Sequence, residues 1–212
     1  MECIEMSKSL TLMSTVLLLA TSLPALAAST VDLTVKGLIT PSACTPNMPG
    51  TVDFGKISAK DLKLDSQTVL KPQSVQLSIS CEASTLFAIT PIDNRSGSST
   101  RSGAYGLGLI NETEKLGRYY LTMGNLVADK PSSLLRQYNP GRWTELPDDE
   151  AVVPNALISL GDLDLSIGWV PHPVQTATLD VVLNTAIAPA NTLTLTNEVA
   201  LDGSATFEVK YL

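Results

Sequence analysis

Apolar and polar residues alternate along the last stretch of the chain, residues 199–211. The apolar set consists of Val199, Leu201, Gly203, Ala205, Phe207, Val209 and Tyr211. A period of two over this length predicts a half-buried β-strand, because successive side chains point to opposite faces of a sheet. A terminal strand commonly lies at a sheet edge, where it offers unpaired backbone groups to another chain. The segment therefore predicts either an ordinary closing strand or an edge that is open to a partner.

Shorter runs of the same kind recur between Gly, Pro, Asn and Ser residues. They cover residues 31–35, 52–57, 75–81, 87–89, 119–123, 163–169 and 179–183. Helical periodicity is almost absent, so the pattern predicts an all-β sandwich. Residues 129–156 are polar and interrupted by prolines, which predicts the longest irregular stretch of the chain.

The N-terminus has the pattern of an export signal. Lys8 precedes the apolar stretch Leu10–Ala20, and small residues follow at Ala25-Leu26-Ala27. The apolar stretch is too short to span a bilayer. We expect a signal peptide at residues 1–27 and a single domain at residues 28–212, with translation starting at Met1 or Met6.

The remaining cysteines fit this export. Removal of the signal takes Cys3 away and leaves Cys44 and Cys81. In an oxidising compartment an even pair is most simply one disulfide, and the alternative is a pair of buried free thiols.

Charge and candidate chemistry narrow the functional classes. The net charge is −7 without any basic block, which argues against nucleic acid and anionic membranes as partners. His172 is the only histidine and lies between two prolines, which favours a rigid turn over an acid–base site. Asp148-Asp149-Glu150 has the composition of a solvated loop. We expect neither catalysis nor a bound metal or cofactor.

The combined layout resembles the subunits of chaperone–usher fimbriae, and in particular a family of fimbrial-like exported proteins of Gram-negative bacteria. The likeness rests on the signal, the two cysteines, the Val52-Asp53-Phe54-Gly55 segment and the terminal strand with its penultimate Tyr211. It implies an immunoglobulin-like, pilin-type sandwich that lacks its last strand. The groove left open, flanked by residues 199–211, would receive a strand from a periplasmic chaperone and later from a neighbouring subunit. The protein would pass through the periplasm and the usher to a fimbrium or the cell surface.

The donor segment departs from the usual fimbrial pattern. Only residues 28–43 precede Cys44 in the processed chain, and Val31, Leu33 and Val35 already have the pattern of a first strand. Either these three residues are the donor, or the subunit accepts a strand without donating one. The second alternative implies a fibre tip or a periplasmic binding module.

A tip protein would need a ligand site. Tyr138, Arg142 and Trp143 form the candidate, since an aromatic ring beside an arginine can stack on a host or surface glycan. The competing interpretation is a loop held in place by its own aromatic residues.

Overall fold

The computed structural model describes residues 33–37, 43–137 and 141–212. Its contacts divide the chain into residues 1–38 and residues 39–212. In the first unit, residues 33–37 form neither helix nor strand, and Leu33 and Val35 are 86% and 88% exposed. The predicted signal peptide at 1–27, Val31 and Tyr138 lie outside the described residues. All further description concerns residues 39–212.

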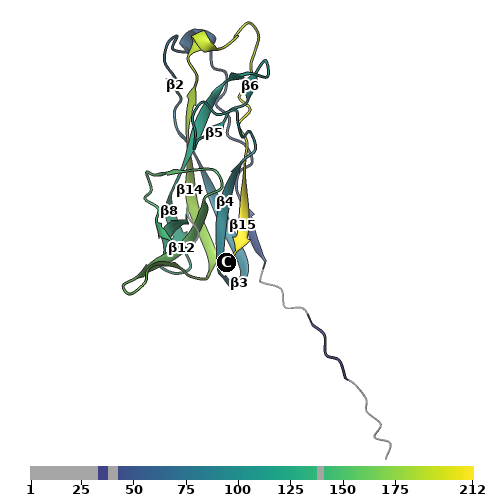
Figure 1. Cartoon of the computed structure of the whole chain (residues 1–212), viewed down its shortest axis with the longest axis vertical. Helices are drawn as coiled ribbons and strands as arrows, with labels where there is room; N and C mark the ends of the chain where they lie inside the picture. Colours follow the sequence, from purple (N-terminus) through teal and green to yellow (C-terminus); the bar gives the residue numbers. More distant parts are fainter. Residues whose placement is uncertain (1–32, 38–42, 138–140) are drawn as a thin grey trace, which may run out of the picture. The chain divides into compact units, whose positions relative to one another are not determined.

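Two antiparallel sheets form this second unit (Figure 1). The first sheet has the order β1-β3-β14-β8-β11 and contains β1 (Cys44–Asn47), β2 (Thr68–Val69), β3 (Gln73–Thr85), β5 (Tyr105–Gly106), β8 (Gly117–Ala128), β11 (Ala151–Val152) and β14 (Val174–Ile187). The second has the order β10-β9-β12-β4-β15 and contains β4 (Phe87–Asp93), β9 (Ser133–Gln137), β10 (Thr144–Glu145), β12 (Leu157–Asp164), β13 (Gly168–Pro171) and β15 (Ala205–Tyr211). A small hairpin of β6 (Leu109–Ile110) and β7 (Glu114–Lys115) and two short helices, η1 (Ala59–Asp61) and η2 (Ala190–Thr192), complete the elements. The predicted all-β, immunoglobulin-like sandwich is confirmed.

The core lies between the inner faces of the two sheets. Alternate residues of the long strands point into it, as the period-two runs predicted. The first sheet contributes Leu77, Ile79, Leu121, Met123, Leu179 and Val181, and the second contributes Ile89, Ile158 and Leu160, all buried.

The predicted disulfide is confirmed. Cys44 and Cys81 are bonded and are also direct register partners in the β1–β3 ladder. Because β1 has only four residues, the bridge fixes a short edge strand to the long strand β3.

The run at residues 163–169 is a β-hairpin, so the prediction of a single strand is wrong. β12 ends at Asp164, and β13 begins at Gly168 and pairs back onto it. The Asp164 carboxylate accepts hydrogen bonds from the backbone N–H groups of Ser166 and Ile167, at 2.7 and 3.2 Å. Gly168 has a φ of +92°, a left-handed conformation that glycine adopts without strain. The alternation of apolar and polar residues continues through the turn, so a periodicity argument cannot detect the turn.

Three further boundaries differ from the sequence predictions. The terminal strand covers only Ala205–Tyr211, because the N–H of Asp202 bonds the Leu107 carbonyl and draws residues 199–204 out of strand geometry. Residues 52–57 pair with no strand among the described residues. The proline-rich segment 129–156 is less irregular than predicted, since it contains β9, β10 and β11.

Candidate functional site

The edge strands β1 and β15 lie on the same side of the sandwich. Among the described strands, β1 is paired only with β3, and β15 is paired only with β4. The two edges approach at one end, where the Cys44 N–H donates to the Tyr211 hydroxyl at 3.0 Å. Away from that bond, no ladder joins the two sheets on this side of the described molecule.

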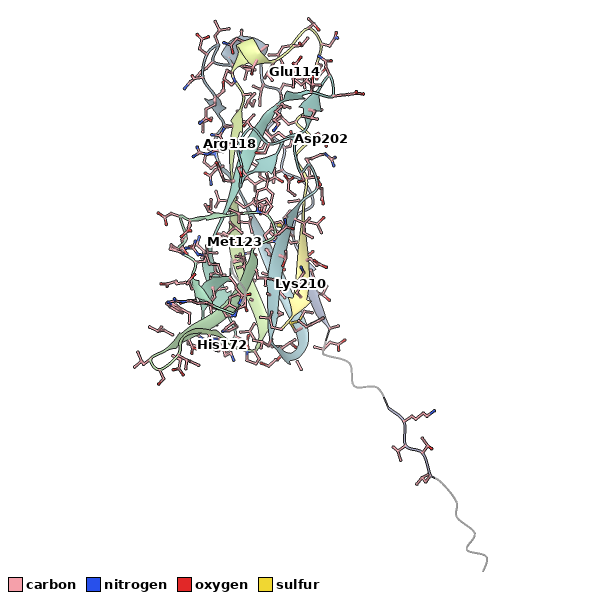
Figure 2. All side chains as sticks on the ribbon, viewed as in Figure 1. Glu114, Arg118, Met123, His172, Asp202 and Lys210 are labelled. Atoms are coloured by element: carbon pink, nitrogen blue, oxygen red, sulfur yellow. A yellow bond between two sulfur atoms is a disulfide. The ribbon has the colours of Figure 1, made fainter. Side chains whose placement is uncertain are left out.

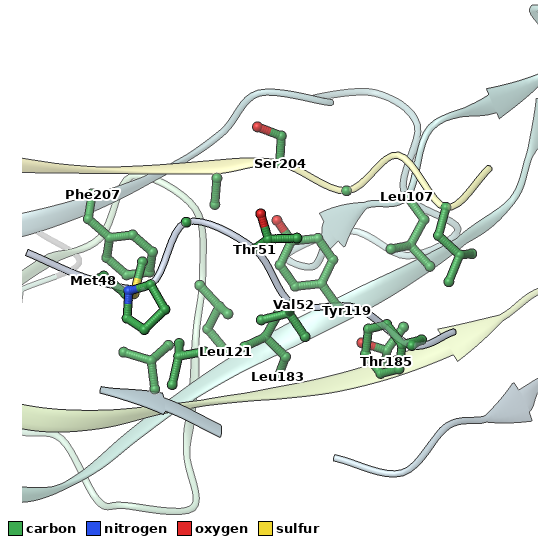
Figure 3. Close-up of a pocket in the computed structure, with 18 residues that line it drawn as sticks. Met48, Thr51, Val52, Leu107, Tyr119, Leu121, Leu183, Thr185, Ser204 and Phe207 are labelled. Carbon is green, nitrogen blue, oxygen red and sulfur yellow. The ribbon is translucent and has the colours of Figure 1, made fainter. Parts of the chain in front are cut away.

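An apolar cleft of about 210 Å³ opens between the segment that follows β1 and the chain that leads into β15. Its floor consists of inner-face side chains, namely Val75, Leu107, Tyr119, Leu121, Val181, Leu183 and Thr185. One rim is formed by Met48, Pro49, Gly50, Thr51, Val52 and Phe54, and the other by Leu201, Gly203, Ser204, Ala205 and Phe207. Met48 and Phe207 lie toward one end of the cleft and Leu107 toward the other (Figure 3).

The floor carries two polar groups with different surroundings. Tyr119 stacks on Tyr105 with ring centroids 5.1 Å apart, and burial raises the pKa of its hydroxyl, so the ring stays neutral. The buried Thr185 hydroxyl has no hydrogen-bond partner among the described residues. The cleft therefore suits apolar side chains and offers one hydroxyl to a polar group that enters with them.

The segment 48–57, which contains the first rim, is weakly held. Its backbone makes no backbone–backbone hydrogen bond among the described residues. A local bond from the Gly55 N–H to the Asp53 carboxylate shapes the turn there. Val52 and Phe54 are half-buried, so apolar contact is what keeps this segment against the sandwich.

The opposite rim is fixed by an ion pair. The Arg95 guanidinium donates two hydrogen bonds to the Asp202 carboxylate, at 2.8 and 2.7 Å. These bonds and the positive charge lower the pKa of Asp202 below its ordinary value of 3.8. Gly203 follows, and a Cβ there would lie 3.1 Å from side-chain carbons of Leu107 and Tyr119. Glycine thus lets this rim approach the floor closely.

The structure brings part of the predicted groove together. Leu201, Gly203, Ala205 and Phe207 line the cleft. Val199 and Val209 are half-buried against the core outside the cleft, and Tyr211 is 46% exposed beside Cys44. The floor residues and the 48–54 rim were not predicted as site residues. The alternating pattern of β8 and β14 predicts that the floor residues on these strands point inward. Only the pairing of the strands places these residues beneath the rims.

The other candidates from the sequence do not form a comparable site. Arg142 is exposed and Trp143 is half-buried. His172 Nε2 lies 3.3 Å from the Ser132 hydroxyl, but its buried Nδ1 has no partner among the described residues, so the pair lacks an orienting carboxylate. A search of the described residues finds no His, Cys, Asp and Glu group suited to a metal ion, and none of their helices is long and apolar enough to cross a bilayer.

Two comparisons with known proteins bear on this chain. Residues 33–111 match a family described as a protein of unknown function (DUF1120). The chain is also 26% identical over 226 residues to an Escherichia coli (strain K12) protein with the description "Uncharacterized protein YhcF". That alignment covers 90% of this chain and 94% of the relative. The family match contains β1, the disulfide and the 48–54 rim of the cleft.

Proposed function

We propose that this protein is a structural subunit of a chaperone–usher fimbria, or of a fimbria-like surface assembly, and that its cleft accepts a β-strand from a partner. The observation that carries the proposal is the position of the cleft. It lies between the β15 side and the segment that follows the edge strand β1, and the backbone of β15 is unpaired on one side among the described residues. A strand added there would gain main-chain hydrogen bonds from β15 and place alternate side chains in the cleft.

The weakly held rim also supports strand addition. Residues 48–57 cover the cleft without backbone hydrogen bonds to the sandwich. An incoming strand can therefore displace this segment without breaking a ladder. Before that happens, the unpaired edge and the apolar cleft favour aggregation of the subunit. A periplasmic chaperone that covers both would prevent it.

The partners follow from this mechanism. The chaperone would supply the first strand, the usher would receive the complex, and another fimbrial subunit would supply the final strand. Leu33 and Val35, both highly exposed, are the described candidates for a strand that this chain donates in turn. We propose no catalytic role for the protein.

Strand addition is tested by completing the sandwich within one chain. A second copy of residues 29–37 is fused after Leu212 through a flexible linker, so that it can run antiparallel to β15. Covering about 300–600 Å² of apolar surface is worth on the order of 10 kcal/mol as an upper limit. The melting temperature should therefore rise by more than about 10 °C over the unfused chain.

The matched control carries Leu33→Asp and Val35→Asp in the fused copy only, and should melt like the unfused chain. A fused strand from a fimbrial chaperone provides the second arm. If that strand stabilises the protein and the chain's own segment does not, the subunit accepts without donating, as a fibre tip would. If neither strand raises the melting temperature, the sandwich is already complete and the proposal is wrong.

A further inference from the structure

Two exposed apolar surfaces lie at opposite ends of the sandwich. The first, the hairpin tip, consists of Leu163, Leu165 and Ile167, which are 51%, 95% and 75% exposed. The second, the apical patch, consists of Leu64 and Val69, which are 64% and 63% exposed. The hairpin tip extends from the end near His172, and β2 with the apical patch lies at the end near Glu114 (Figures 1 and 2).

The hairpin tip is a rigid surface. The Asp164 carboxylate accepts two backbone N–H groups of the turn, and β13 pairs back onto β12 residue by residue. Leu165 and Ile167 are therefore presented in a fixed geometry instead of on a loose loop. Three large apolar side chains exposed within five residues indicate a surface that another molecule covers.

Charge distinguishes the two surfaces. The hairpin tip is flanked by the exposed carboxylates of Asp162 and Asp164. The apical patch is flanked by three exposed lysines, Lys60, Lys63 and Lys71. The same segment contains Asp61 and Asp65, and Asp65 accepts a hydrogen bond from the Asn191 amide at 2.8 Å. Residues 59–71 therefore have a net charge of +1 and residues 162–168 a net charge of −2, so the two surfaces differ in sign.

One molecule cannot bring its own two surfaces together. β14 starts at Val174, two residues after His172, and its last residues, Ala186 and Ile187, pair with β2. Fourteen residues of strand at roughly 3.3 Å each span about 45 Å. Any contact between the hairpin tip and the apical patch must join two copies.

We infer that the hairpin tip of one copy docks on the apical patch of a second copy of this chain. Such a contact is heterologous, so each copy keeps one free surface and the contact can repeat along a fibre. β1 begins beside the chain's C-terminus at the hairpin end (Figure 1), where the Cys44 N–H donates to the Tyr211 hydroxyl. The inference rests on the proposed function, which has successive copies assemble into a fibre. It specifies which surfaces of those copies touch.

The test uses the full chain with the fused donor strand, because a filled cleft prevents association by strand exchange. Sedimentation equilibrium measures self-association, and Leu165→Ser and Leu64→Ser should each weaken it about tenfold. Val127→Ser is the matched control, because Val127 is 67% exposed on β8 and belongs to neither surface. It should leave the association constant unchanged.

Charge reversal identifies the pairing. Asp162→Lys and Lys63→Asp should each weaken association, and the chain that carries both changes should recover most of it. Recovery is expected only if the two residues meet across copies. The inference is overturned if the fused chain does not self-associate, or if Leu165→Ser and Leu64→Ser change the association constant no more than Val127→Ser does. It is also overturned if the chain with both charge reversals associates as weakly as the sum of the two single losses in free energy predicts.

A second assay separates this contact from membrane binding. The same variants are co-sedimented with phosphatidylcholine vesicles. Loss of vesicle binding in Leu165→Ser, with self-association unchanged, would overturn the inference in favour of a lipid surface. The melting temperature of the same samples tests strand addition independently of self-association. A fused chain that is stabilised but monomeric would refute the end contact and leave the proposed function intact.

Discussion

The two long sides of the sandwich differ in how their edge strands are connected. On one side, β10 ends one sheet and β11 ends the other, and the chain passes directly between them through residues 146–150. On the other side, β1 and β15 come from opposite ends of the unit and share the bond from Cys44 to Tyr211. We call these the closed side and the open side. A direct chain connection joins the two sheets on the closed side. On the open side only side-chain contacts lie between them.

The closed side shows what a finished edge requires. Leu146 is 2% exposed, and its N–H donates to the Leu134 carbonyl at 2.8 Å. Glu150 forms an ion pair with Arg136 next to it. On the open side, the segment 48–57 lies in the corresponding position with half-buried apolar residues and no backbone hydrogen bonds to the described molecule. The open side therefore lacks the main-chain hydrogen bonds that complete the closed side.

The largest effect should come from detaching β1. Cys44→Ser with Cys81→Ser removes a cross-link over 37 residues, which costs about 4 kcal/mol of unfolding free energy in the chain-entropy model. Denaturant titration measures the loss. The unaltered protein titrated with a reductant should unfold at the same denaturant concentration as the double variant. Equal stability of the oxidised protein and the variant would mean that the bridge does not hold the open side.

The next largest effect contrasts the same substitution on the two sides. Leu146→Ala on the closed side should cost about 3 kcal/mol, because a fully buried leucine leaves a cavity. Leu201→Ala on the cleft rim should cost about 1 kcal/mol, because that side chain is only half-buried beside an open cleft. Both values come from denaturant unfolding. Similar losses at the two positions would contradict the distinction between the sides.

The long central strands were predictable from residue order, and the short strands of the closed side were not. Long strands such as β3, β8 and β14 display a clear period of two, which a sequence pattern records. β10 and β11 have two residues each, too few for any period, so residues 129–156 were predicted to be irregular. The cleft itself depends on pairing, for example of Leu121 with Leu183, which no local pattern contains.

Errors on the open side also have local causes. The alternation at residues 199–204 satisfies a strand pattern, but the Asp202 contacts with Arg95 and Leu107 hold the backbone elsewhere. Residues 52–57 alternate as well, and no partner strand among the described residues pairs with them. A periodicity argument identifies which residues face inward, and tertiary contacts decide whether a ladder forms.

A smaller effect is expected where the two edges of the open side touch. Tyr211→Phe removes the hydroxyl that accepts the Cys44 N–H, which should cost about 0.5–1 kcal/mol because the bond is exposed to solvent. Hydrogen exchange at the Cys44 amide should accelerate by a few-fold. Tyr120→Phe is the matched control, since the Tyr120 hydroxyl has no hydrogen bond among the described residues. Unchanged exchange at Cys44 would show that the edges do not depend on this contact.

The smallest effect should come from the ion pair on the cleft rim. Asp202→Asn removes the carboxylate that holds residues 199–204 against Arg95, and its cost at pH 7 should be smaller than that of Tyr211→Phe because both groups face solvent. The pKa of Asp202 is lowered in the folded protein, so its stabilisation is present above the unfolded value near 3.8 and is lost as the pH falls through the folded value. Urea titrations of both proteins should therefore differ at pH 7 and converge toward pH 2. Asp149→Asn, at an exposed aspartate without a described ion pair, should leave the free energy of unfolding at pH 7 unchanged. A constant gap between Asp202→Asn and the unaltered protein at all pH values would mean that backbone contacts, and not the charge, fix this rim.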